Sequence, residues 1–173
     1  MNVVDFETRR ATPSDADDIA AAHRDSIRSL GALFYPTEIV NDWSARLMGE
    51  AYLKAMERGE VFYIAVGAIA GESTVLGFAS HRVEAGQHRT AVYVRGATSR
   101  RGIGSALFRL AEAQALAVGA TNIHVDASLA AVEFYKANGF DEVGRGEHRL
   151  RSGRPMACVF MEKTLRTTGI VGV

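Results

Sequence analysis

One stretch in the middle of the chain limits the possible folds more than any other. Residues 91–94 form a short apolar run suited to a buried strand, and a loop rich in Gly, Ser, Thr and Arg follows it. Gly119 stands where a helix cap is expected, and residues 123–126 alternate as a second strand. A strand, a glycine loop, a helix and a strand predict two parallel strands joined by a right-handed crossover. The 3.6-residue spacing predicts a helix whose inward face holds Ile103, Ala106, Leu107, Leu110, Ala113 and Ala117.

The loop before this helix is the candidate ligand site. Gly102 and Gly104 have no Cβ atom, so an anionic ligand can approach the backbone closely. The first amides of a helix have no partner within it and carry the positive end of its dipole, which together favour phosphate. Arg100 and Arg101 add positive charge. The alternative is a tight strand-to-helix turn, in which the glycines serve geometry and the arginines serve solubility.

Two segments resemble a known superfamily. The run Arg100-Arg101-Gly102-Ile103-Gly104-Ser105-Ala106-Leu107 is similar to the acetyl-CoA loop of the GNAT N-acetyltransferases. About 25 residues later, the segment 128–140 resembles the second signature of that superfamily, in which an Asn or Ser precedes Ala, Tyr and a Gly-Phe pair. One position departs from the pattern, because Ser99 stands where the family usually has Gln or Arg. A side-chain contact from that position is therefore in doubt, whereas the backbone amides are unaffected.

The resemblance implies an architecture and a ligand. The expected fold is one α/β domain over residues 1–165, with a mixed, mostly antiparallel sheet of about seven strands, a central splayed parallel pair and about four flanking helices. Residues 166–173 have no periodicity and are expected to form a mobile tail. Acetyl-CoA is the implied co-substrate. Its expected contacts are Tyr93, Val94, Ser99, Arg100, Arg101, Gly102, Ile103, Gly104, Ser105, Ser128 and Tyr135.

The resemblance also suggests catalytic and acceptor-binding residues. Tyr135 matches the position of the general acid, and a phenol with an ordinary pKa near 10 is protonated at neutral pH, as an acid must be. The alternative is that Tyr135 only packs against the cofactor. Ser128 is expected to cap the following helix. Tyr35 and Trp43 are candidate walls of an acceptor pocket, although either could be plain core. Proton removal is expected through ordered water or through a strand histidine, either His81 or His124.

Local patterns predict the remaining elements. Thr12 and Asp15 form a capping box for a first helix that ends near Ser29 and turns Ile19, Ala22, His23 and Ile27 inward. Further helices are expected from Pro36 and at residues 51–58. The expected strands are residues 6–10, 61–68, 73–83, 88–94, 123–126, 146–150 and 156–163.

Composition narrows the function. The formal net charge of zero gives no sign of a nucleic-acid or membrane surface. The single cysteine, Cys158, excludes an internal disulfide and a multi-cysteine metal site, so no metal is expected. Residues 1–10 lack the features of a signal peptide, so a cytoplasmic protein is expected. The sequence does not decide between a monomer and a homodimer.

These observations predict an acetyl-CoA-dependent N-acetyltransferase that moves an acetyl group directly to an amine of a small molecule or peptide. Two alternatives belong to other classes. A dinucleotide-binding module would share the order of strand, glycine loop and helix, but Leu107 stands in place of its third glycine. A non-catalytic acetyl-CoA sensor on the same fold would keep the loop and lack turnover.

Overall fold

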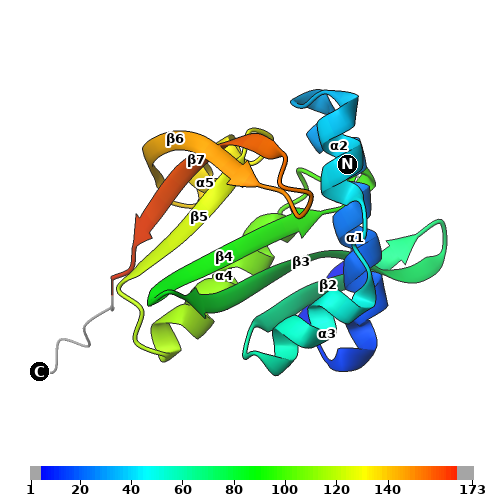
Figure 1. The fold of residues 1–173 in the computed structure, drawn as a ribbon. Coiled ribbons are helices and arrows are strands. Elements are labelled where there is room, and N and C mark those ends of the chain that lie inside the picture. The colour runs from blue at the N-terminus through cyan, green and yellow to red at the C-terminus, as the bar shows by residue number, and fades with distance from the viewer. Residues whose placement is uncertain (1–4, 167–173) are drawn as a thin grey trace, which may run out of the picture.

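The computed structural model describes residues 5–166, and the expected mobile tail lies outside them except for Arg166. A seven-stranded sheet has the order β1-β2-β3-β4-β5-β7-β6, and all neighbouring strands are antiparallel except β4 and β5 (Figure 1). This confirms the predicted mixed α/β fold with a central parallel pair. The strands are β1 (Phe6–Arg10), β2 (Val61–Ile69), β3 (Glu72–Glu84), β4 (Gln87–Val94), β5 (Asn122–Ser128), β6 (Asp141–Arg149) and β7 (Pro155–Thr164).

Helices cover both faces of the sheet. Phe78 and Ala79 are neighbours on β3 but belong to different clusters, because successive side chains of a strand point to opposite faces. Phe78 packs with α1 and α3, and Ala79 packs with α4. Within residues 5–166 there are five α-helices where about four were expected: α1 (Ala16–Ser29), α2 (Thr37–Ser44), α3 (Gly49–Glu57), α4 (Ile103–Ala117) and α5 (Val132–Ala137).

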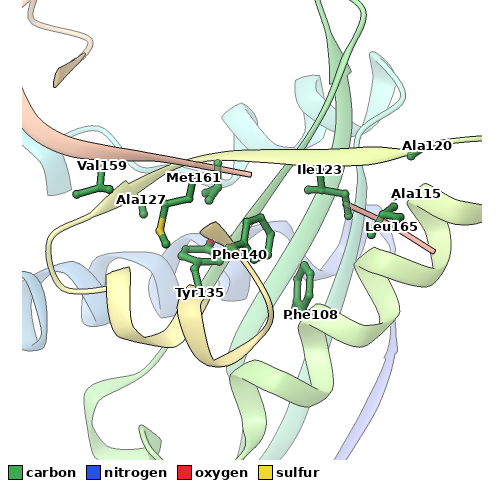
Figure 2. Packing of buried hydrophobic residues seen from close by; sticks show 11 residues of the cluster. Phe108, Ala115, Ala120, Ile123, Ala127, Tyr135, Phe140, Val159, Met161 and Leu165 are labelled. Carbon is green, nitrogen blue, oxygen red and sulfur yellow. The ribbon is translucent and has the colours of Figure 1, made fainter. Parts of the chain in front are cut away.

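The buried face of α4 differs from the predicted one. Ile103 and Leu107 are buried as expected, but Ala113 and Ala117 are exposed. The buried row continues at four-residue spacing through Ala111 and Ala115, with Phe108 beside it. Phe108 packs against Phe140 at 5.3 Å between ring centroids (Figure 2). An aromatic side chain gains more from burial than an alanine, so it sets the face that the helix presents.

The start of the first helix is confirmed in part. The capping box between Thr12 and Asp15 is present, but residues 13–15 form a 3₁₀ turn and α1 begins only at Ala16. Asp15 accepts two hydrogen bonds of 2.8 Å from the Arg9 guanidinium. These bonds lower the pKa of the Asp15 carboxyl to about 2. The turn is therefore tied to β1 as well as capped.

Strand β6 is longer than predicted. The expected strand began at Gly146, whereas β6 begins at Asp141 and pairs with β7, which lies between β5 and β6. Gly144 and Gly146 pack against the Phe160 ring, and a Cβ atom at Gly146 would lie 2.7 Å from it. These glycines interrupt the apolar pattern of the strand because the Phe160 ring occupies the space of their side chains. Among the described residues, no helix is both long and apolar enough to cross a membrane.

Candidate active site

The two parallel strands diverge in the middle of the sheet. β4 and β5 are bridged by one residue pair, Arg89 with His124, whereas β3 and β4 pair over eight residues. The Arg95 amide donates to β3, so by strand alternation the amides of Val92 and Val94 face the gap between β4 and β5. Among the described residues the Val94 amide has no printed partner, so the gap offers at least one backbone donor to an extended chain.

Tyr135 on α5 reaches into this gap. Its hydroxyl accepts a hydrogen bond of 3.1 Å from the Val92 amide, and its side chain is only 2% exposed. The rings of Phe134 and Phe140 each lie 5.1 Å from the Tyr135 ring, which fixes its position. Figure 2 shows Tyr135 beside Phe140. Burial, and then the nearby Tyr93, raise the pKa of Tyr135 far above its usual value. The phenol is therefore protonated, and its own hydrogen remains available to a second acceptor.

The glycine loop ends in an open helix N-terminus. Gly102 caps α4 with φ of +80°, a left-handed conformation that favours glycine, and no heavy atom lies within 4 Å of where its Cβ would be. The first helical bond runs from the Ala106 amide to the Gly102 carbonyl. The amides of residues 103–105 therefore have no partner within the helix. Open space and unpaired amides at this point fit the diphosphate of a CoA-type ligand.

Other residues of the loop have structural contacts. A Cβ atom at Gly104 would lie 2.8 Å from the Phe134 ring, so this glycine allows α4 and α5 to pack closely. The Ser99 hydroxyl donates to the Gly96 carbonyl at 2.9 Å. The Ser105 hydroxyl accepts from the Asn138 side chain at 3.2 Å. Arg100 and Arg101 lie beside these residues, at the edge of the open N-terminus.

The predicted cap of α5 is wrong. Ala131 is the N-cap residue, and no side chain caps this helix. Ser128 contributes its carbonyl, which accepts the Ala131 amide at 2.9 Å. Its side chain is free to line the adjoining cavity.

Helix α1 is attached to the start of the loop. The Asp25 carboxylate accepts the Gly96 amide at 2.9 Å and lies 3.7 Å from the Arg95 guanidinium. A side chain at Gly96 would collide with Ser29, so the loop approaches α1 as closely as glycine allows. The position of the loop thus depends on α1.

A cavity of about 400 Å³ adjoins the gap. It is walled by α1, α2 and α3, by the face of β3 and β4 that carries Phe78, and by the tip of the β6–β7 hairpin. In Figure 1 this tip reaches toward α1 and α2. Four of the residues predicted from sequence line the cavity: Trp43, Tyr93, Ser128 and Tyr135.

Three predicted pocket residues lie outside its lining. The Tyr35 hydroxyl donates to the Ala157 carbonyl at 2.6 Å and accepts the Leu129 amide at 2.8 Å, so it joins three segments behind the wall. His81 is on the opposite face of β3 and forms a 2.9 Å hydrogen bond with His88. His124 shares a face with Asp126, as expected, but it does not line the cavity, and its Nδ1 atom lies 3.9 Å from the Glu162 carboxylate.

Sequence reasoning missed the role of His23. It was expected to turn inward from α1, and the structure places its ring in the cavity wall, 3.9 Å from the Tyr93 ring. Its Nδ1 atom shares a 2.7 Å hydrogen bond with the Tyr52 hydroxyl, and its Nε2 atom has no partner among the described residues. Burial lowers the pKa of His23 to about 3, so the ring is neutral.

Sequence reasoning also missed a cluster of charged side chains that links the two diverging strands, β4 and β5. The Arg89 guanidinium donates to the Asp126 carboxylate at 2.6 Å, which joins β4 to β5. The other Asp126 oxygen lies 3.7 Å from the Nδ1 atom of His148 on β6. His148, and then Arg89, lower the pKa of Asp126 to about 2. The three side chains line the same cavity, but they come from three strands, so only the alternation on β5 hinted at Asp126.

Two strands that part around a buried phenol, beside an open helix N-terminus, define the architecture of a CoA-dependent acyltransferase. A family model for the GNAT acetyltransferase domain matches residues 35–165. The chain belongs to the GNAT acetyltransferase family, whose co-substrate is acetyl-CoA.

Solved structures agree with this fold. One, described as a GCN5-related N-acetyltransferase (aminotransferase, class II) from Rhodopseudomonas palustris, is 30% identical, with 95% of this chain and 99% of that chain covered and a TM-score of 0.79. PaiA N-acetyltransferase from Thermoplasma acidophilum, solved with coenzyme A, is 19% identical over 93% and 99%, with a TM-score of 0.72. A phosphinothricin acetyltransferase from Sinorhizobium meliloti, solved with acetyl-CoA, is 18% identical over 96% and 95%, with a TM-score of 0.69. No curated protein matches the chain.

Proposed function

We propose that this protein is an N-acetyltransferase that moves the acetyl group of acetyl-CoA directly to an amine of a small molecule or peptide. The observation that carries the proposal is the Tyr135 hydroxyl. It lies at the Val92 amide, inside the gap between β4 and β5, with the open α4 N-terminus at one side and the cavity at the other. A thioester and an amine bound on these two sides would meet at the phenol.

The chain supplies the binding groups for the co-substrate. The amides of residues 103–105 would hold the diphosphate, with Arg100 and Arg101 adding positive charge. The gap-facing amide of Val94 would pair with the pantetheine arm in the manner of an added strand, with Tyr93 and Ser128 beside it. Acetyl-CoA supplies an acetyl group activated as a thioester.

Tyr135 is the proposed general acid. Its raised pKa keeps its proton in place, and the Val92 amide occupies its oxygen, so the hydroxyl hydrogen is directed to another acceptor. The thiolate that leaves the thioester is that acceptor. Cys158 is buried and burial raises the pKa of its thiol, which argues against a covalent acetyl-enzyme. Direct transfer within a ternary complex needs only that amine and thioester be held together.

The experiment separates an enzyme from a sensor. Acetyl-CoA binding is measured by calorimetry, and CoA release is followed with a thiol reagent while a panel of neutral, anionic and cationic primary amines is offered. The proposal expects binding together with amine-dependent CoA release and an acetylated product by mass spectrometry. Binding with no turnover on any amine would favour the sensor, and no binding would remove both readings.

A further inference from the structure

The side chains that line the cavity carry more positive than negative charges. Each of its three carboxylates already has an arginine partner among the described residues. The pairs are Asp126 with Arg89 at 2.6 Å, Asp42 with Arg154 at 3.1 Å, and Glu60 with Arg82 at 3.8 Å. Within residues 5–166, every carboxylate that lines the cavity therefore has a cationic partner.

Three further arginines line the cavity: Arg58, Arg149 and Arg151. None of them forms an ion pair with any residue between 5 and 166. Arg149 donates to the Gly153 carbonyl, a neutral acceptor that leaves its charge uncompensated. The three arginines are exposed at the cavity and give its lining a formal excess of positive charge, although the chain as a whole has a net charge of zero.

Arg151 is held at the cavity by the loop that carries it. This loop is the tip of the β6–β7 hairpin, which is bonded to α2 through Ser152 and Asp42. On either side of the tip, Leu150 and Met156 are buried in a cluster with residues of α1 and α2. The positive charge of Arg151 contributes to the lowered pKa of His23 on the cavity wall. Arg151 is thus placed to meet a ligand in the cavity.

We infer that the acceptor is a small primary amine that also carries a carboxylate, which Arg151 binds. This inference rests on the proposed function and names the substrate class of the same site. The amine itself must be neutral to attack, so the remaining charge of the acceptor decides how well it fits. A carboxylate can pair with one guanidinium through charge-assisted hydrogen bonds, whereas a polyamine would add positive charge to a cavity whose carboxylates already have cationic partners among residues 5–166.

The test compares amines that differ only in the carboxylate. CoA release is measured with α-, β- and ω-amino acids, each beside its own carboxamide, and with putrescine and spermidine. The inference expects at least one amino acid whose kcat/KM exceeds that of its carboxamide by about tenfold or more. Carboxamides or polyamines used as well as amino acids would overturn it and leave the proposed function standing. No turnover on any amine while acetyl-CoA still binds would overturn both.

A matched pair of variants assigns the effect to the cavity. With the preferred amino acid, Arg151→Gln should raise KM about tenfold, and the preference for the amino acid over its carboxamide in kcat/KM should fall by a similar factor. Arg145→Gln is the control, because Arg145 lies on the same hairpin, outside the cavity, and pairs with Glu142. If Arg151→Gln uses the amino acid as efficiently as the control does, the inference is wrong.

A different observation, the cluster of Arg89, Asp126 and His148, carries a second inference. Asp126 lies between the other two, 2.6 Å from the guanidinium and 3.7 Å from Nδ1 of the imidazole. A carboxylate beside Nδ1 favours the tautomer with its hydrogen there and leaves Nε2 as a proton acceptor. The His148 side chain is half exposed, so a proton that it takes can pass to solvent.

The geometry points to His148 as the group that takes the amine proton. As the N–C bond forms and the C–S bond breaks, the amine proton moves to Nε2 of His148 and the Tyr135 proton moves to the leaving sulfur. Solvent then restores both residues. The products are the acetylated amine and CoA with a free thiol, so no other reactant is required.

Imidazole rescue tests this role. His148→Ala should lower kcat at least tenfold, and added imidazole should restore part of the loss. The control is His124→Ala, since His124 is on the same face of the sheet and outside the cavity. Full activity of His148→Ala, or a loss that imidazole does not reverse, would overturn the inference.

Discussion

Replacement of Tyr135 by phenylalanine removes one oxygen atom from the gap between β4 and β5. The ring should stay in place, because Phe134 and Phe140 pack against it and the side chain is 2% exposed. The oxygen has two roles in our reading. It accepts the Val92 amide at 3.1 Å, and it donates a proton during the reaction.

The two roles predict separable effects. Without the oxygen, the Val92 amide loses its acceptor, and a buried donor left unsatisfied costs about 1–3 kcal/mol of folding stability. For a chain of this size, each kcal/mol lowers Tm by about 2–4 °C. Loss of a general acid removes a further contribution in the transition state alone. Because general acids typically contribute about 10²-fold or more, we expect kcat to fall at least tenfold, or about 1.4 kcal/mol in the barrier.

Steady-state CoA release gives kcat and KM, calorimetry gives acetyl-CoA affinity, and thermal unfolding gives Tm. We expect a lower kcat, an affinity within a few-fold of the parent protein and a modest fall in Tm. Tyr63→Phe is the matched control, because the Tyr63 hydroxyl contacts Gln114 at 3.3 Å and lies outside the cavity. If Tyr135→Phe loses stability but keeps its kcat, the phenol is structural and the acid is another group.

Three further predictions concern buried contacts. His23 has a pKa of about 3 in the folded protein and near 6.5 in the unfolded chain, so the free energy of unfolding should decrease as the pH falls from about 6.5 toward 3. The urea midpoints measured at pH 7 and at pH 5 should therefore differ less for His23→Gln than for the parent protein. Gly104→Ala should lower Tm by crowding Phe134, and Phe134→Leu should restore part of it in a double-mutant cycle. Tyr35→Phe should cost about 1–3 kcal/mol in urea unfolding, because the Leu129 amide loses its acceptor; an unchanged midpoint would contradict that assignment.

The features that could be predicted from the sequence are those that depend on residues close together in the chain. The strand, glycine loop and helix over residues 91–117 were found because each is a local pattern, and the parallel pair followed from the crossover rule. Gly104 shows the limit of such reasoning. The sequence indicated that another group must approach the Gly104 backbone closely, and a ligand was expected there. The structure shows that the Phe134 ring, 30 positions later in the chain, also lies against Gly104.

The contacts that shape the cavity join distant parts of the chain. Asp126 and His148 meet across β7, which lies between β5 and β6, and no pattern of neighbouring residues reveals that strand order. Tyr35 was placed in the pocket from its aromatic character, yet the Leu129 amide, 94 residues away, holds it behind the wall. Burial of a polar side chain depends on such partners, and a single sequence does not name them.

The bond between Asp25 and Gly96 has a consequence for engineering. Asp25 is two residues from His23 on α1, so one helix both lines the cavity that we propose for the acceptor and holds the loop that we propose for the cofactor. A substitution that moves α1 to admit a bulkier amine will displace Gly96 with it. Redesigned acceptor selectivity along α1 should therefore always register as a changed Michaelis constant for acetyl-CoA, and compensating substitutions belong at residues 95–99.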